Sequence, residues 1–221
     1  YVELKYNRDE SVTGLTSKLG AEVDGKLVRT FSGSTLSSVT SYSNNPAECL
    51  LDYLTSTFYG CGDVMSDSDL DLDSFISHKA FCDTLITHTD KEGNSTTAKR
   101  YTTNGVINTF DERDLNVSDL VICSQSIFSY NLGKFQVVSD TTGSSVMSFN
   151  PDNMYGDVTI VNDGFNSSLN KLNISFSSYD QKYQDDQVFL DLPDNLKSYN
   201  EPELVQDTRF KFINNNIMAQ R

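Results

Sequence analysis

The stretch "NNPAECLLDYLTSTFYGCG", residues 44–62, predicts the first helix of the chain and its abrupt end. Either of the two adjacent asparagines can cap the helix, and Pro46 suits the first turn, where a missing backbone N–H costs no hydrogen bond. Apolar residues then recur at helical spacing: Ala47, Leu50, Leu51, Leu54 and Phe58. Gly60 and Gly62 are expected to end the helix.

Two more helices are predicted downstream. Residues 66–86, "SDSDLDLDSFISHKAFCDTLI", carry an apolar stripe made of Leu72, Phe75, Ile76, Ala80, Phe81 and Leu85. Residues 111–129 predict a third helix. We expect the core between the first two helices to consist of Leu50, Leu54, Phe75 and Phe81.

Alternating apolar residues predict strands around these helices. Residues 26–31, "KLVRTF", follow an Asp-Gly turn, and the Ser- and Thr-rich residues 32–43 predict an exposed connection. A hairpin is predicted at 130–140. The other predicted strands are 99–110, 157–163, 170–180 and 185–193, with a polar loop at 90–98 and the start of a further helix within 204–221. This mixture predicts an α+β fold.

The charge balance restricts the partners of the chain. Its 221 residues carry a formal net charge of −14, and they contain no run of Lys or Arg. An acidic surface repels phosphate, so specific nucleic-acid binding is not expected. No apolar run approaches the roughly 20 residues of a spanning helix, so no membrane segment is expected either. The chain begins at Tyr1 and ends within a predicted helix, so we expect a fragment of a longer protein.

The reactive residue types form no recognisable catalytic or metal-binding motif. Four dispersed cysteines predict reduced core thiols, with a Cys49–Cys82 disulfide as the alternative. The two histidines, His78 and His88, are expected at the surface. We therefore predict no enzyme activity, no catalytic, cofactor-binding or metal-binding residues, and no cofactor.

The acidic run from Asp67 to Asp73 invites a calcium interpretation. An EF-hand loop starting at Asp67 would need Gly at its sixth position and Glu at its twelfth, where this chain has Leu72 and His78. Carboxylates at the start of a helix are already favoured by the helix dipole. We interpret the run as helix capping.

Several segments together carry a resemblance to a known family. "NPAECLLDYLTSTFYGCG", "LDLDSFISHKAFCD" and "KRYTTNGVINT" occur in this order, followed by Leu132-Gly133-Lys134 and by Phe149 to Gly156. This order and spacing resemble the tail-tip hub proteins of long-tailed bacteriophages, the tip attachment or host specificity protein J type. The resemblance covers roughly residues 20–192. Met154-Tyr155 depart mildly from the family, which usually has an Ile-Ile type pair there.

The resemblance implies a structural protein of the virion, assembled in the bacterial cytoplasm. The expected parts are a truncated β-rich segment of a hub domain (1–44), a helical insertion with a strand (45–110), an α+β hub domain with antiparallel strands (111–192) and a polar segment (193–221). The implied partners are further copies in a homotrimer and other tail proteins, with viral DNA passing nearby. Host receptor contact is expected outside this chain. The alternative function is a secreted or surface carbohydrate-binding module.

Overall fold

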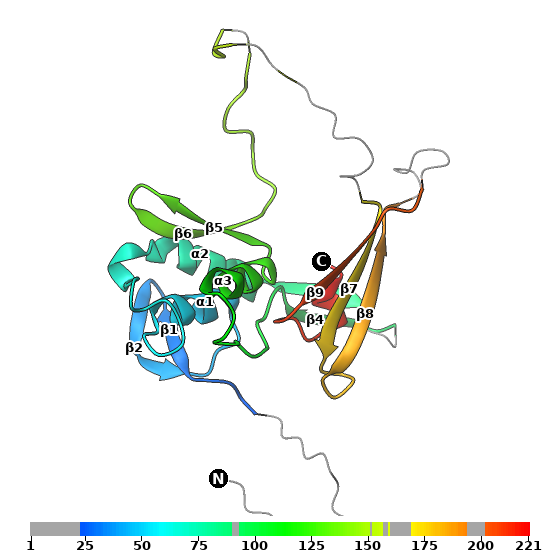
Figure 1. The fold of residues 1–221 in the computed structure, drawn as a ribbon, viewed down its shortest axis with the longest axis horizontal. Helices are drawn as coiled ribbons and strands as arrows, with labels where there is room; N and C mark the ends of the chain where they lie inside the picture. Colours follow the sequence, from blue (N-terminus) through cyan, green and yellow to red (C-terminus); the bar gives the residue numbers. More distant parts are fainter. Residues whose placement is uncertain (1–22, 90–92, 151, 157–158, 160–168, 194–201) are drawn as a thin grey trace, which may run out of the picture.

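The computed structural model describes residues 23–89, 93–150, 152–156, 159, 169–193 and 202–221. Within these ranges the fold is α+β, as the sequence predicts, with short helices and four short sheets (Figure 1). The helices are α1 (Pro46–Thr55), the single 3-10 turn η1 (Asp67–Asp69), α2 (Leu72–Asp83), α3 (Arg113–Ile122) and α4 (Asn216–Ala219).

Three of the sheets are antiparallel hairpins. They pair β1 (Val28–Ser32) with β2 (Thr35–Ser41), β3 (Leu85–Thr89) with β4 (Ser95–Lys99), and β5 (Ser126–Asn131) with β6 (Lys134–Ser139). The fourth sheet has the order β8-β7-β9, built from β7 (Lys171–Ser178), β8 (Gln184–Asp191) and β9 (Val205–Phe210). Strand β7 is antiparallel to β8 and parallel to β9.

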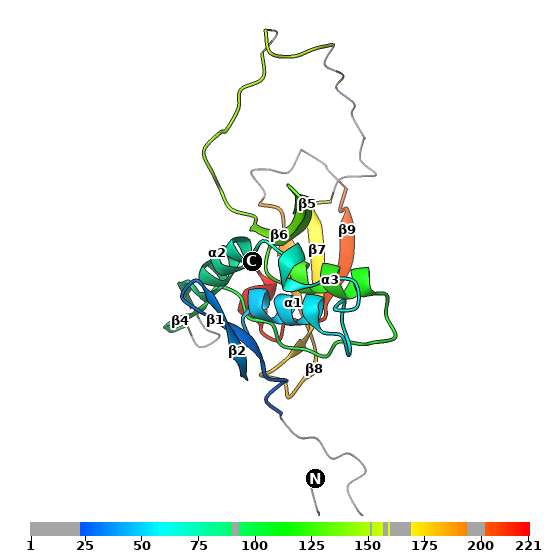
Figure 2. The same cartoon turned by 90° about the vertical axis from the view of Figure 1, so that its left-hand side faces the viewer.

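Helix α1 lies in the middle of the N-terminal part, where α2, α3 and β1 contact it (Figure 2). The sequence predicts the start of this helix but not its end, because α1 stops at Thr55, before Gly60 and Gly62, and Phe58 of the predicted stripe is 93% exposed. Asn45 accepts a hydrogen bond from the backbone N–H of Ala47, and Pro46 occupies the first turn. Leu50, Leu54 and Phe75 are buried as predicted, whereas Phe81 is only partly buried at the margin of the core.

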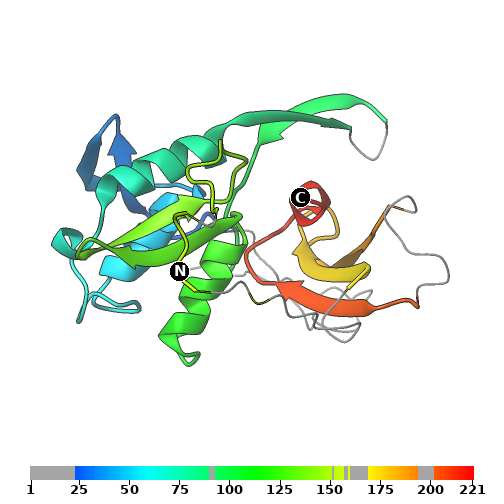
Figure 3. The same ribbon diagram turned by 90° about the horizontal axis from the view of Figure 1, so that it is seen from above.

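The core continues from this helical part into the C-terminal sheet. Phe212 and Ile213 lie in the same buried cluster as Tyr101 of the N-terminal part and Phe176 of β7. Backbone hydrogen bonds support the junction, because the N–H of Asn104 donates to the carbonyl of Phe212 over 2.9 Å. The β3–β4 hairpin instead extends away from the end of α2 (Figure 3).

Some predicted boundaries are wrong, and most of the errors concern strands. The connection predicted at 32–43 contains β2, which is largely exposed. The loop predicted at 90–98 contains most of β4, because β-branched threonines pair well across a hairpin. The strand predicted at 99–110 is therefore wrong: β4 ends at Lys99, and the residues that follow are irregular.

The ends of the second and third predicted helices are also wrong. Leu85 belongs to β3, since α2 ends at Asp83. Helix α3 ends at Ile122, and a turn through Gln125 at φ 50° leads into β5, whose aromatic residues gain a cross-strand partner in β6. The hairpin prediction at 130–140 is confirmed for its turn and for β6.

The C-terminal third mixes confirmed and wrong predictions. Strands β7 and β8 confirm the strands predicted at 170–180 and 185–193. The first third of the helix predicted within 204–221 is strand β9, because β7 offers it a full set of parallel backbone partners, and within this range only α4 is helical. The strand predicted at 157–163 lies, except for Thr159, outside the described residues.

Candidate functional site

An apolar hollow lies between the turn after α1, helix α3 and strand β5. This groove, which we call the α3 groove, has a volume of about 520 Å³. Its walls are formed by Leu54, Cys61, Met65, Arg113, Asp114, Val117, Ser118, Val121, Ser126, Ile127 and Phe128. Leu54 and Val121 form part of the buried core, whereas Ile127 is 60% exposed. The groove therefore opens the hydrophobic core towards solvent.

Two glycines explain how the chain forms the first wall of this groove. A Cβ atom at Gly60 would lie 1.7 Å from the carbonyl oxygen of Tyr53, and one at Gly62 would lie 2.3 Å from that of Thr55. The turn therefore folds back tightly onto the last turn of α1. The N–H of Cys61 donates to the carbonyl of Tyr53 over 3.0 Å, which places Cys61 and then Met65 against the groove.

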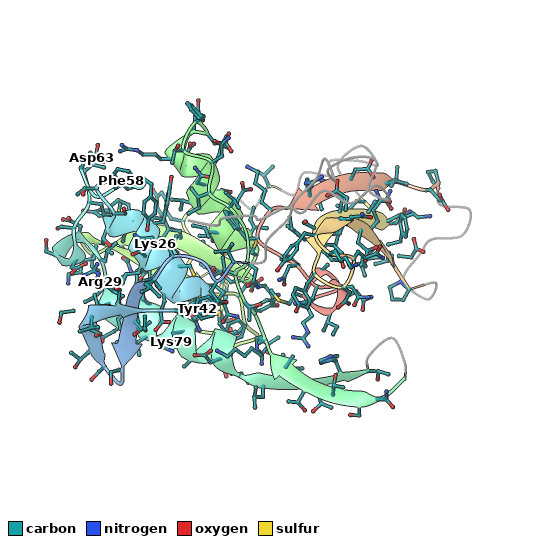
Figure 4. The ribbon with its side chains drawn as sticks, turned by 90° about the horizontal axis from the view of Figure 1, so that it is seen from below. Lys26, Arg29, Tyr42, Phe58, Asp63 and Lys79 are labelled. Carbon is teal, nitrogen blue, oxygen red and sulfur yellow. The ribbon has the colours of Figure 1, made fainter. Side chains whose placement is uncertain are left out.

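The rim of the α3 groove is acidic. Arg113 forms a two-pronged ion pair with Asp63, with nitrogen–oxygen distances of 2.6 and 3.1 Å, and this contact lowers the pKa of the Asp63 carboxyl below its ordinary value. Glu112 and Asp114 flank Arg113 at the start of α3, and both are exposed. Of these charged residues, Arg113 and Asp114 line the groove, and Asp63 is the carboxylate that binds Arg113. Asp63 lies beside the exposed ring of Phe58 on the turn after α1 (Figure 4).

A second, polar hollow of about 370 Å³ lies beside the β1–β2 hairpin, where Tyr42 and Lys79 lie next to each other (Figure 4). Its most buried ionisable group is Glu48, only 2% exposed. The Glu48 carboxylate accepts hydrogen bonds from the N–H of Phe31 and the hydroxyl of Ser43, and Lys79 lies 3.5 Å away. These contacts join α1 to the hairpin.

The charges of this polar hollow neutralise one another. Lys79 lies 3.0 Å from Asp83, and Lys99 lies 2.7 Å from the same carboxylate. Burial works to raise the pKa of Asp83, but the contacts from Lys99 and Lys79 outweigh it and hold that pKa below its ordinary value. The network therefore fixes α2 against α1 and β4, and it offers no surplus charge to a ligand.

The prediction that His78 is a surface residue is wrong. Its side chain is buried on α2, where its ring nitrogens lie 2.8 Å from the Ser139 hydroxyl and 3.0 Å from the Ser124 hydroxyl. The partners come from β6 and from the turn after α3, so one imidazole connects three elements. Burial lowers the pKa of His78 to about 4, so the ring is neutral at pH 7. His88 is partly buried on β3, 2.7 Å from the Thr96 hydroxyl.

The His78 cluster resembles a nucleophile–base pair only in composition. The Cys82 sulfur lies 3.6 Å from a ring nitrogen of His78, but burial raises the pKa of this thiol to about 12. A reactive cysteine needs a lowered pKa and access to substrate. Neither Cys82 nor His78 lines the α3 groove or the polar hollow. The cluster is a packing contact.

All four cysteines are free thiols, as the sequence predicts, so the Cys49–Cys82 disulfide does not form in this structure. Cys49 is only partly buried, and its thiol donates to the carbonyl of Ser43. Burial raises the pKa of Cys49 and Cys123 to about 12 as well. At neutral pH these thiols are protonated and unreactive.

Two carboxylates of the acidic run are engaged within the chain, but Asp71 makes no capping side-chain hydrogen bond at the start of α2, so the capping interpretation is wrong there. Asp67 accepts two hydrogen bonds of 2.7 Å from Arg29, and Asp69 accepts from the backbone and hydroxyl of Ser66. Asp71 precedes the first residue of α2. Among the described residues, no group of three or more His, Cys, Asp or Glu side chains is arranged to hold a metal ion.

Sequence reasoning missed the α3 groove and the buried carboxylate of Glu48. A signal for the groove exists in the two glycines after α1, which mark a close approach of backbone segments. Comparison with protein-family models and with curated proteins finds no match. None of the helices in the part of the chain that the structure describes has the length and apolar character that a membrane crossing requires.

Proposed function

We propose that the chain is a structural component of a bacteriophage tail tip, forming part of the central hub that closes the tail tube. The observation that carries this proposal is the ordered set of segments from Asn45-Pro46-Ala47 to the Phe149–Gly156 element, which resembles tail-tip hub proteins. In this role the chain forms a homotrimer, contacts other tail proteins, and participates in DNA passage and host attachment in the virion. It is not an enzyme.

The distribution of charge supports a position beside passing DNA. Most of the described Lys and Arg side chains lie against carboxylates of the same chain, as Arg29 does with Asp67, Lys99 with Asp83 and Arg209 with Asp185. The net charge of −14 is then carried by the remaining carboxylates. A surface of this kind repels phosphate and lets a polyanion slide without holding it.

The apolar surface supports contact with neighbouring proteins. Phe58, Phe110 and Leu132 are each more than 90% exposed, at 93%, 96% and 96%. They lie on the turn after α1, before α3 and at the tip of the β5–β6 hairpin. Neighbouring proteins would cover these side chains in the proposed assembly, although apolar side chains scattered singly are also common on protein surfaces.

The proposal is tested by the mass of the purified chain in solution and by its binding to glycans. Light scattering of the purified chain should give a threefold mass, and electron microscopy a threefold ring. A monomer over the whole micromolar range would contradict the homotrimer. Calcium-dependent binding on a glycan array would instead favour the alternative function, a secreted or surface carbohydrate-binding module.

A further inference from the structure

We propose that the α3 groove is a docking site for a protein segment that carries apolar anchor residues flanked by Lys or Arg. The groove is described above by its lining, from Leu54 on α1 to Phe128 on β5. The inference does not rest on the proposed function, since it depends only on the shape and charge of this surface.

The floor and walls of the groove call for apolar anchors. Cys61, Met65 and Val117 lie along it, and Val121 continues the same stripe of α3 one turn further. On the opposite wall, Ile127 is 60% exposed and stands opposite Val138, which is 45% exposed, on the outer face of the β5–β6 hairpin. Covering these side chains removes apolar surface from water.

The charge at the rim of the groove predicts the charge of the segment that binds there. Arg113 and Asp114 are the charged residues that line the groove, and the Arg113 guanidinium is already engaged by Asp63. Asp114 therefore places an uncompensated negative charge at the rim, next to an apolar floor. A segment with basic residues on either side of its apolar anchors matches both features, because rim charges of opposite sign favour encounter and register.

The same electrostatics disfavour other occupants. A second copy of this chain brings a net charge of −14 to an acidic rim, and a nucleic acid brings phosphates. The groove is open along its length and shares its floor with the core, so it suits a side-chain stripe of a polypeptide.

The proposal is tested with a random peptide library displayed on particles and selected against the full chain. The selected peptides should combine aliphatic or aromatic residues with Lys or Arg. A synthetic copy of the most enriched peptide is then titrated calorimetrically into the wild type. Ile127→Lys should weaken its binding about tenfold or more, because a charge enters the apolar wall, whereas Val39→Lys on exposed β2 should not.

The charge of the rim is tested separately with a matched pair of variants. Asp114→Asn should weaken the peptide about threefold and reduce its salt dependence, whereas Asp73→Asn, at the corresponding first turn of α2, should leave both unchanged. Enriched peptides without Lys or Arg, no enrichment at all, or binding that survives Ile127→Lys would overturn the proposal. Self-association of the chain that Ile127→Lys abolishes would also overturn it, in favour of a second copy.

Discussion

Helices α1 and α2 lie side by side but are held in different ways. Seven of the ten residues of α1 are buried, whereas only three of the twelve residues of α2 are. Helix α1 is capped by the side chain of Asn45, while Asp71 at the start of α2 makes no capping side-chain bond. Helix α1 is therefore held mainly by apolar packing. Helix α2 depends more on a few hydrogen bonds and ion pairs, which are directional contacts.

Several directional contacts of α2 lead to the β5–β6 hairpin and the turn before it, and the Lys79 network adds others to α1 and β4. The hydroxyl of Ser74 accepts a hydrogen bond from the N–H of Val137, and the N–H of Asp71 donates to the carbonyl of Phe135. His78 adds its contacts to Ser124 and Ser139. Stability in this region should therefore depend on the protonation of the buried His78 side chain.

The largest effect is expected from truncation of a core residue of α1. Leu54 is 1% exposed, so Leu54→Ala should lower the free energy of unfolding by about 2–5 kcal/mol, because it leaves a cavity. Leu72→Ala, in the half-buried first turn of α2, should cost about 1–2 kcal/mol. Denaturant titration measures both. A Leu54→Ala loss under about 0.5 kcal/mol, the range of an exposed site, would contradict the buried position.

The second prediction concerns acid. The pKa of His78 is about 4 in the folded chain and about 6.5 when unfolded, so the unfolded state binds the proton more readily. The contribution of His78 is fully present above about pH 6.5 and is lost as the pH falls towards 4, by about 3 kcal/mol in total. The Cys82 thiol beside it stays neutral throughout, since its pKa is about 12.

Denaturant titrations across this pH range, on three proteins, measure the effect of acid. His78→Gln should flatten the profile, because glutamine does not titrate. His88→Gln, a histidine on the β3–β4 hairpin, should leave the acid sensitivity in place. If the wild type and His78→Gln lose stability in parallel between about pH 6.5 and 4, the account of α2 is wrong.

A smaller effect distinguishes the two helix starts. Asn45→Ala should cost about 1–2 kcal/mol, since it removes the bond to the N–H of Ala47 and the bond to the carbonyl of Lys79. Asp71→Ala should cost less than about 0.5 kcal/mol. Equal losses in thermal or chemical unfolding would remove the contrast between the helices.

The smallest effect is expected from calcium. The Asp67 carboxylate is paired with Arg29, and the Asp69 carboxylate accepts a hydrogen bond from the Ser66 hydroxyl. Calorimetry should therefore detect no stoichiometric calcium site with a Kd below about 10⁻⁴ M. Calcium should also leave the unfolding midpoint unchanged. A tighter site would revive the carbohydrate-binding alternative, because extracellular modules often use calcium at that affinity.

The sequence predicts what local patterns control. The start of the first helix, with its cap and its proline, follows from neighbouring residues, and the core positions Leu50, Leu54 and Phe75 follow from helical spacing. Its end does not, because α1 stops at Thr55, before Gly60 and Gly62. Strand β7 follows from the alternation of Leu172, Ile174 and Phe176.

What it fails to predict depends on distant partners. His78 precedes Lys79 on the helix, which suggests an exposed position. Its burial depends on two serines more than 40 residues away in the sequence. Strand β9 forms because β7 offers it a parallel edge, and no local pattern shows this. The α3 groove likewise combines residues from α1, α3 and β5, so its lining emerges only once these elements are packed.

Electron cryomicroscopy of particles assembled with this chain tests the proposed function most directly. The account predicts a threefold ring at the end of the tail tube, with a channel wall poor in Lys and Arg. Arg29, Lys99, Arg100 and Lys134 should lie on outer or subunit-facing surfaces, since exposed cations on the wall would hold phosphate. A channel lined by these residues, or a density for the chain away from the tail tip, would contradict the account.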